Sequence, residues 1–231
     1  METSDSKEKE ALVREELIRT ATIADLDEIS QLEALCFPPA EAASRDAFKW
    51  RLLAYPTHFW VLEQGGKILS FINGPVTQEK DLKDEMYDDP NFCDEEGEWQ
   101  MVFGVVTHPK HQHQGLASRL MQRFIEEAQI ERRKGIVLTC KDEKITFYKQ
   151  FGFKNEGISS SVHGGVAWYQ MRLIFLDPKL PLISSEHESQ SIRARYIRNV
   201  VFLQVSSSIA RSIVSAPPVR SLGCNERCFI R

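Results

Sequence analysis

Residues 103–120, FGVVTHPKHQHQGLASRL, have the residue types and spacing to bind an anion. The segment is typical of an apolar strand, a polar turn that contains Gly115, and the start of an amphipathic helix. Amides in the first turn of a helix have no partner within the helix and carry about half a positive charge, so they can bind phosphate oxygens. A glycine there lets the ligand approach the backbone closely. The segment predicts a phosphorylated cofactor, although it is neither a Walker loop nor the dinucleotide GxGxxG pattern.

Three histidines in the same turn, His108, His111 and His113, also allow a metal site. Strong zinc motifs place their ligands on a helix face or as two Cys/His pairs, and this turn does neither. Cys224 and Cys228 likewise lack a second pair. We therefore expect no metal, and solvent-exposed histidines beside the phosphate.

Two motifs together resemble the GNAT acetyltransferase superfamily. Residues 112–117, QHQGLA, are similar to its Q/R-x-x-G-x-G/A acetyl-CoA signature, and residues 139–153, TCKDEKITFYKQFGF, to its strand-then-helix segment that ends in F-Y-x-x-F-G-F. The resemblance covers residues 17–175 and is closest to the arylalkylamine (serotonin-type) N-acetyltransferases. Those enzymes also show a hairpin like residues 59–75 and a loop like CFPPAEAAS at 36–44.

This resemblance implies acetyl-CoA as co-substrate and assigns its contacts. The pyrophosphate is expected on the amides of residues 113–118. The pantetheine arm is expected along the strand edge at 105–107, where the strand splays away from residues 139–141. The implied cofactor-binding residues are Val105, Val106, Thr107, Gln112, His113, Gln114, Gly115, Leu116, Ala117, Ser118, Thr139, Tyr148, Lys149 and Gln150.

Amine acetylation needs an acid and a base. The amine must lose a proton before its lone pair can attack the thioester, and coenzyme A leaves as a thiolate. The resemblance places Tyr148 beside the thiol, where the phenol can protonate the sulfur. A strand amide such as that of Val105 can hold the oxyanion.

The identity of the base is open. In the vertebrate serotonin enzymes two histidines on the central strand connect through water to the amine, and the matching positions here are Met101 and Phe103. The candidates are Glu98 at the head of that strand, Glu41 in the 36–44 loop, and His108 just beyond the strand. An acceptor that enters partly as the free amine is the alternative.

These inferences predict direct transfer of acetyl to a primary amine in a ternary complex, because no serine or cysteine nucleophile with a base partner is visible. We expect a small arylalkylamine first and a polyamine second. Residues 78–98 hold ten acidic and two basic groups, which is typical of a solvated face but would also attract a cationic amine. The alternatives are a protein lysine or N-terminal acetyltransferase and a non-catalytic acetyl-CoA-binding module, and then a metal-binding interaction protein.

The elements that must position these residues follow from hydrophobic periodicity. Helices are predicted at 25–37, 44–55, 115–131 and 142–151. Strands are predicted at 17–22, on both sides of Gly65-Gly66, through 99–107 without interruption, at 135–140, and in two segments within 153–175. This order predicts an α/β (α+β) domain, with a GNAT-like mixed, twisted central sheet of about seven strands flanked by about four helices.

Length and composition set the remaining limits. With 231 residues, 42% of them hydrophobic and 27% charged, we expect a charged segment at 1–16, one N-acetyltransferase domain at 17–176, and a mostly irregular C-terminal tail at 177–231. The tail carries +4 and the rest −8, so no nucleic-acid partner is expected. A polar N-terminus, no apolar run of about 20 residues, and five scattered cysteines predict a cytoplasmic protein without a membrane partner. The oligomeric state is left open, with a monomer favoured.

Overall fold

The computed structural model describes residues 16–175. The predicted domain at 17–176 falls within this range except for its last residue. The predicted charged segment at 1–16, apart from Glu16, and the predicted tail at 177–231 lie outside the described residues.

Within the described range the chain forms nine strands and four α-helices, joined by loops and short 3₁₀ turns. In chain order they are β1 (Glu16–Thr20), α2 (Leu26–Cys36), α3 (Arg45–Ala54), β2 (Phe59–Gln64), β3 (Lys67–Asn73), β4 (Val76–Thr77), β5 (Trp99–Val102), β6 (Gly104–Thr107), α4 (Leu116–Ile130), β7 (Gly135–Cys140), α5 (Ile145–Lys149), β8 (Lys154–Ile158) and β9 (Tyr169–Ile174).

Most elements form where periodicity predicted them, because local signals and packing agree. The Ser44 hydroxyl accepts a hydrogen bond from the Ala47 amide at 3.0 Å and so caps α3. The hairpin of β2 and β3 turns at Gly65 and Gly66, whose φ angles of 59° and 73° suit a two-residue turn. The predicted helix at 142–151 is shorter than expected, since its first turn is a 3₁₀ turn and α5 has only five residues.

The prediction of one uninterrupted strand through residues 99–107 was wrong. The strand breaks at Phe103, where β5 ends and β6 begins. The Phe103 amide donates to the Asn73 carbonyl at 2.7 Å, although Gly104 is the residue in register with Asn73. Phe103 and Gly104 therefore both lie opposite Asn73, as in a β-bulge, and the chain changes direction at this point.

The break assigns the two halves of this segment to different sheets. One sheet has the order β1-β2-β3-β6, and the other has the order β4-β5-β7-β9-β8. In the second sheet β5 and β7 are parallel and in register from Trp99 and Gly135 to Val102 and Leu138, while its other pairs are antiparallel. The predicted mixed α/β architecture with four helices is confirmed, and the strand count is nine instead of about seven.

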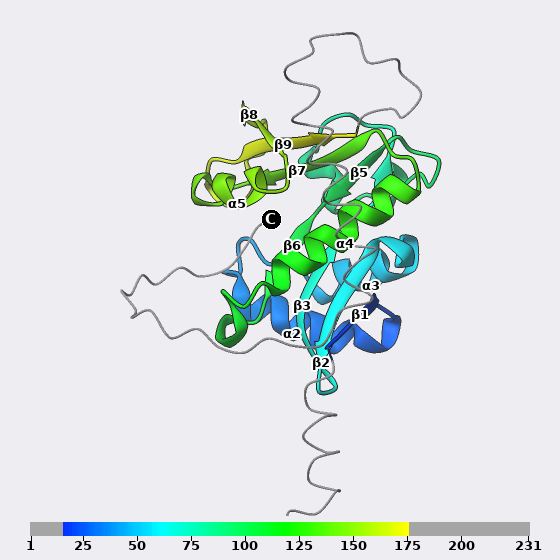
Figure 1. Cartoon of the computed structure of the whole chain (residues 1–231), viewed down its shortest axis with the longest axis vertical. Helices are drawn as coiled ribbons and strands as arrows, with labels where there is room; N and C mark the ends of the chain where they lie inside the picture. The colour runs from blue at the N-terminus through cyan, green and yellow to red at the C-terminus, as the bar shows by residue number, and fades with distance from the viewer. Residues whose placement is uncertain (1–15, 176–231) are drawn as a thin grey trace, which may run out of the picture. The chain divides into compact units, whose positions relative to one another are not determined.

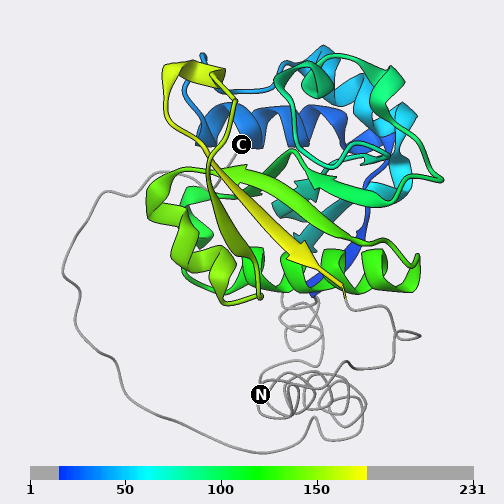
Figure 2. The ribbon, with the colours of Figure 1, turned by 90° about the horizontal axis from the view of Figure 1, so that it is seen from above.

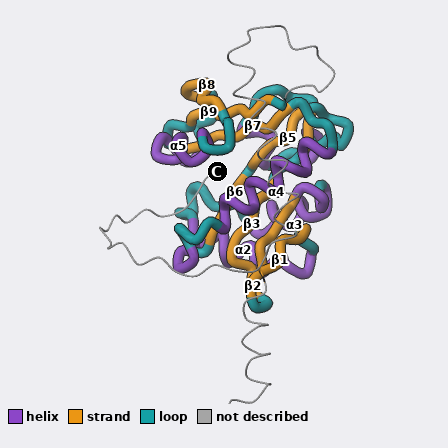
Figure 3. Tube along the Cα trace, in the orientation of Figure 1, coloured by secondary structure: helices purple, strands orange, loops and turns teal. Residues whose placement is uncertain are grey.

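Helices cover both faces of the sheets (Figures 1 and 2). On one face, which we call the α4 face, side chains of α4 and α5 pack with those of β2, β3, β5, β6 and β7 in one core cluster. On the other, the α2 face, α2 and α3 cover the first sheet, and Trp50 of α3 joins this second cluster to a third around Phe103. Seen from above, the strands lie between α2 on one side and α4 on the other (Figure 2), and the tube view marks the same helices and strands by type (Figure 3).

Candidate active site

The turn that the sequence predicts to bind phosphate lies at the start of α4. Gly115 is the N-cap residue, with φ of 80°, and His113 also lies in the left-handed region, with φ of 61°. The amides of residues 113–118 donate no hydrogen bond to any residue within 16–175, and the helical ladder begins with the Arg119 amide on the Gly115 carbonyl. This end of α4 therefore presents a row of amides that can bind an anion.

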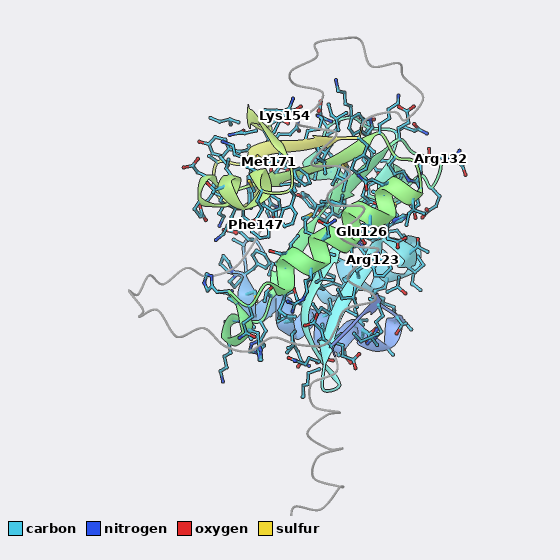
Figure 4. The ribbon with its side chains drawn as sticks, viewed as in Figure 1. Arg123, Glu126, Arg132, Phe147, Lys154 and Met171 are labelled. Carbon is cyan, nitrogen blue, oxygen red and sulfur yellow. The ribbon has the colours of Figure 1, made fainter. Side chains whose placement is uncertain are left out.

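A cavity of about 280 Å³ lies against this row of amides. Gln150 and Phe147 also line it, so it joins the start of α4 to α5, and Phe147 is labelled in Figure 4. Most of the predicted cofactor-binding residues line it, namely Thr107, Gln112, His113, Gly115, Leu116, Ala117, Ser118 and Gln150, together with His111 and Phe147, which were not among them. The cavity has the position that a phosphorylated ligand on these amides would need.

Other predicted cofactor residues lie elsewhere. Val106 is buried on the α2 face among side chains of α2 and α3, so its side chain does not face the cavity. Lys149 and Gln114 are exposed and do not line the cavity. Val105 and Thr139 are fully buried at the splay between the two sheets.

This splay leaves one edge of β6 open. β3 is the only partner of β6 among the described strands. The His108 amide donates to the Leu69 carbonyl at 2.8 Å, so these two residues form a hydrogen-bonded pair in the antiparallel ladder of β3 and β6. Hydrogen-bonded and non-hydrogen-bonded pairs alternate along such a ladder, so the amides and carbonyls of Val105 and Thr107 point away from β3. Across the splay, β7 continues past its last pairing with β5, through Thr139 and Cys140. An extended ligand can hydrogen-bond to the Val105 edge in this space.

Tyr148 projects from α5 into the α4-face core next to this opening. The side chain is fully buried, and its hydroxyl is one of three buried side-chain polar atoms in residues 16–175 without a hydrogen-bond partner. Burial raises the pKa of Tyr148 well above its ordinary value, and the Cys140 thiol adds to this effect. Burial, with help from Glu143 and Asp142, also raises the pKa of Cys140 to about 12. Tyr148 is therefore a protonated donor at neutral pH that lacks an acceptor.

Glu41 and Lys141 meet on the opposite face. Lys141 Nζ donates to both carboxylate oxygens of Glu41, at 2.9 and 2.8 Å. Successive side chains along a strand point to opposite faces of the sheet. Val137 packs in the cluster around Phe103, so Thr139 and Lys141 point to the α2 face as well. Cys140 points to the other face and packs with Tyr148 in the core cluster of the α4 face. The Glu41 side chain is 8% exposed. A buried carboxylate thus lies across the splay from the phenol.

Residues from two further loops lie around Glu41. His163 Nε2 lies 3.5 Å from the Glu41 carbonyl, and its ring lies 5.8 Å from that of Tyr87 and 6.4 Å from that of Trp168. Lys141 Nζ lies 5.7 Å from the centroid of the Trp168 ring. We call these five residues the Glu41 cluster. Sequence reasoning missed Tyr87 and His163, because no spacing signal connects loops around residues 41, 87 and 163.

Glu98 and His108 lie away from the Glu41 cluster. β5 and β7 are parallel, so Glu98 at the start of β5 lies beside Lys134 at the start of β7, and the two form an exposed ion pair at 2.6 Å. The cluster lies instead beyond the opposite end of β7. His108 follows β6, about 13 Å along the chain from Gly104 at the break. It lines a second cavity, of about 500 Å³, between α2 and the β2-β3 hairpin. Burial, His111 and Lys110 lower the pKa of His108.

Met101 and Phe103, where the serotonin-type enzymes carry histidines, are buried in an apolar cluster with Tyr87 and Val137. The Phe103 ring lies 4.6 Å from the Tyr87 ring. The central strand therefore supplies no titratable side chain at these two positions.

The described residues show neither a metal site nor a membrane span. The rings of His108 and His111 pack edge to face at 5.4 Å, but residues 16–175 contain no group of three or more His, Cys, Asp and Glu side chains placed to hold a metal. No helix in that range is both long and apolar enough to cross a membrane. Cys224 and Cys228 lie outside it.

The split central strand, the open edge of β6 and the free amides of α4 define an α/β domain that can hold an extended, phosphorylated ligand. Residues 56–155 match the sequence profile of the family described as "Acetyltransferase (GNAT) domain". Residues 56–155 are thus similar to a GNAT acetyltransferase domain, as the two motifs predicted. A search of the curated proteins finds no significant match to this sequence.

Solved structures share the fold at low sequence identity. The loading GNATL domain of CurA from Lyngbya majuscula is 20% identical, with a TM-score of 0.61 over 70% of this chain and 98% of that one. The GphF GNAT-like decarboxylase in complex with isobutyryl-CoA is 20% identical, with a TM-score of 0.61 over 68% and 98%. The yncA structure from Salmonella typhimurium, solved with its cofactor acetyl-CoA, is 19% identical, with a TM-score of 0.54 over 73% and 99%. The structural similarity to these three proteins shows a shared fold.

Proposed function

We propose that this protein transfers acetyl from acetyl-CoA directly to a primary amine. The observation that carries the proposal is the unpartnered Tyr148 hydroxyl, buried beside the opening between β6 and β7. A buried hydroxyl without a partner is costly to keep, so it indicates a missing acceptor. The sulfur of a thioester lying in that opening would be such an acceptor.

The residues of the splay fit acetyl-CoA. The free amides of residues 113–118 can bind its pyrophosphate, with Gln150 and Phe147 closing the other side of the cavity. The outward-facing backbone of Val105 can hydrogen-bond the pantetheine arm, and its amide can hold the oxyanion. When bound, acetyl-CoA supplies an activated acetyl group on a thiol that leaves readily.

Tyr148 and Glu41 then divide the proton transfers. Glu41 accepts the proton that the amine loses as the new N–C bond forms, directly or through one water. Tyr148 donates its proton to the sulfur as the C–S bond breaks, and it regains a proton from solvent after the products leave. The raised pKa of Tyr148 keeps that proton in place until the thiolate develops. Glu98 and His108 are less suited, because both lie away from the Glu41 cluster.

Acidic and aromatic groups around Glu41 suit a cationic aromatic amine. The Oδ1 atom of Asp84 is buried and lacks a hydrogen-bond partner among the described residues, while its Oδ2 accepts from the Val162 amide at 3.0 Å. Tyr87, His163 and Trp168 offer ring faces close by. A small arylalkylamine therefore comes first as acceptor and a polyamine second.

The test is acetyl-CoA-dependent thiol release from the full chain, with tryptamine, spermidine and a lysine-containing peptide as acceptors and a reaction without acceptor as background. We expect release above background with tryptamine, and slower release with the peptide. No release with any acceptor, while calorimetry still shows acetyl-CoA binding, would reject the transferase and favour a non-catalytic acetyl-CoA-binding domain.

A further inference from the structure

Arg51 is a buried cation that the proposed transfer does not use. It lies on α3 and is only 2% exposed. Its single hydrogen bond among the described residues runs from Nη2 to the Tyr87 carbonyl at 3.1 Å, and its Nε atom is buried without a partner. A guanidinium has five N–H donors in a planar fork, so most of its capacity is unused here.

A second arginine shows how this fold neutralises a buried guanidinium. Arg172 on β9 is 3% exposed. Its Nε and Nη2 donate to the Glu156 carboxylate at 2.8 and 2.9 Å, and Asp81 forms a further ion pair with it. Within residues 16–175, Arg51 has no such carboxylate partner. Because an uncompensated buried charge is strongly unfavourable, Arg51 has the properties of a site that awaits an anion.

Aromatic rings surround Arg51 in place of acids. Its Cζ atom lies 5.1 to 6.0 Å from the ring centroids of Phe48, Trp50, Tyr87 and Phe103. Ring faces attract a cation and leave the edge of the guanidinium fork available. Such a setting suits a planar anion, and a carboxylate can accept two parallel hydrogen bonds from the fork.

The position of Arg51 connects it to the acceptor side of the site. The nearest ring is that of Phe103, the residue at which the central strand breaks. The Phe103 ring contacts that of Tyr87, and the Tyr87 ring contacts that of His163 beside Glu41. The short turn Asp84–Tyr87 connects Arg51 to a second unpartnered group. Its first residue, Asp84, carries the unpartnered Oδ1 atom, and the carbonyl of its last residue, Tyr87, accepts the hydrogen bond from Arg51.

We infer that Arg51 binds a carboxylate on the acceptor, so that the amine substrate is an aromatic amino acid or a related aminocarboxylate. The inference rests on the proposed function and narrows its acceptor class. The incoming carboxylate replaces the Tyr87 carbonyl at the guanidinium, and the turn Asp84–Tyr87 shifts to admit it. The substrate ammonium meets Asp84 before it passes its proton to Glu41.

The decisive comparison uses tryptophan and tryptamine, which differ only in the carboxylate. We expect wild-type kcat/KM to be about 10- to 100-fold higher for tryptophan, the effect of one charge-assisted bidentate contact. Arg51→Gln should abolish this preference mainly through KM for tryptophan. Arg51→Lys should keep a small part of it, because a lysine is a point charge without the fork. A wild-type enzyme that acetylates tryptamine as well as tryptophan would overturn the inference while leaving the transferase intact.

Two controls separate this inference from folding effects and from the proposed function. Arg123→Gln removes another guanidinium that lies over a ring, 4.9 Å from the centroid of Trp60, and should leave the tryptophan preference unchanged. Indole-3-propionate carries the carboxylate without the amine, so wild type should bind it more tightly than tryptophol in a calorimetric titration. Equal or absent binding of these two compounds would also overturn the inference, even if Arg51→Gln failed to fold or no acceptor released thiol.

Discussion

Lys141 holds both carboxylate oxygens of Glu41, and in doing so it ties the end of β7 to the loop between α2 and α3. The residue before it, Cys140, faces Tyr148 on the other side of the sheet. Cys140, the last residue of β7, and Lys141, the residue after it, thus reach the proposed acid on one face and the proposed base on the other. In the proposed mechanism, the splay of β6 from β7 at this point lets the amine meet Glu41 while the thioester sulfur meets Tyr148.

Replacing Glu41 tests the proposed base. Glu41→Gln keeps the shape and can still accept a hydrogen bond from Lys141, but it cannot take a proton. We expect kcat with tryptamine or tryptophan to fall by about 10²- to 10⁴-fold, with KM for acetyl-CoA unchanged. Steady-state kinetics at fixed pH measures this. Glu98→Gln is the matched comparison, and a larger fall in that variant would transfer the role to Glu98.

Lys141→Met separates the positioning of Glu41 from its chemistry. Removing the ammonium leaves a carboxylate that is largely buried without its partner, so we expect about 1–3 kcal/mol less stability in urea unfolding. The double variant Glu41→Gln/Lys141→Met should recover part of this loss, because no charge is then left unpaired. Strict additivity of the two single effects would show that the ion pair contributes nothing.

Tyr148→Phe should lower activity without lowering stability. The hydroxyl has no partner within the described residues, so its removal should leave the free energy of unfolding unchanged or slightly higher. We expect kcat to fall about 10²-fold or more, with little change in acetyl-CoA binding. Because the pKa of Tyr148 is raised well above 10, the wild-type rate should not decline between pH 8 and 9.5. A decline in that range, absent from the variant, would mean that the phenol ionises there.

Much of the fold could be predicted because each segment carries its own local signal. The apolar positions of α4, the Ser44 cap and the Gly65-Gly66 turn act within a few residues of one another. The break at Phe103 could not be predicted, since it depends on a hydrogen bond from the Phe103 amide to Asn73 of β3, whose register partner is Gly104. An unbroken apolar run looks the same whether it feeds one sheet or two.

The same distinction between local signals and contacts of distant segments applies to the candidate site. The α4 turn is contiguous in sequence, so its residues could be named from a motif. The pairing of Glu41 with Lys141 spans one hundred positions, and His163 brings three loops together through its contacts with the Tyr87 ring and the Glu41 carbonyl. The spacing of residues in the sequence gives no signal that predicts such contacts. Among the predicted bases, the fold brings Glu41 to the splay and leaves Glu98 and His108 elsewhere.

Gly115→Ala tests the phosphate-binding turn. With φ of 80°, alanine at this position is strained, and the nearest side-chain atom to a new Cβ is Arg119 Nη1 at 3.4 Å, so the effect should come from the backbone. We expect about 1 kcal/mol less stability and a several-fold higher KM for acetyl-CoA, with kcat nearly unchanged. Gly66→Ala has a similar φ of 73° but lies in the hairpin turn, and should cost stability without altering KM. An unchanged KM in Gly115→Ala would argue against cofactor binding at this turn.

Stability below neutral pH should depend on Asp25, which joins β1 to the start of α2. Arg19 donates from Nη1 and Nη2 to the two Asp25 oxygens at 2.8 and 2.9 Å, and this bonding lowers the pKa of Asp25 despite partial burial. A carboxyl whose pKa is lowered in the folded state stabilises that state fully at pH values above its unfolded-state pKa of about 4. This contribution to the free energy of unfolding is lost as the pH falls through the folded-state pKa. Asp25→Asn should therefore lower the urea midpoint at pH 7, and the difference in midpoint from wild type should narrow toward pH 2.5.

The control variant Asp27→Asn breaks an exposed ion pair with Arg45 and should show almost no difference in urea midpoint from wild type at either pH. A gap for Asp25→Asn that stays constant from pH 7 to 2.5 would show that lost packing, and not the ion pair, causes the destabilisation.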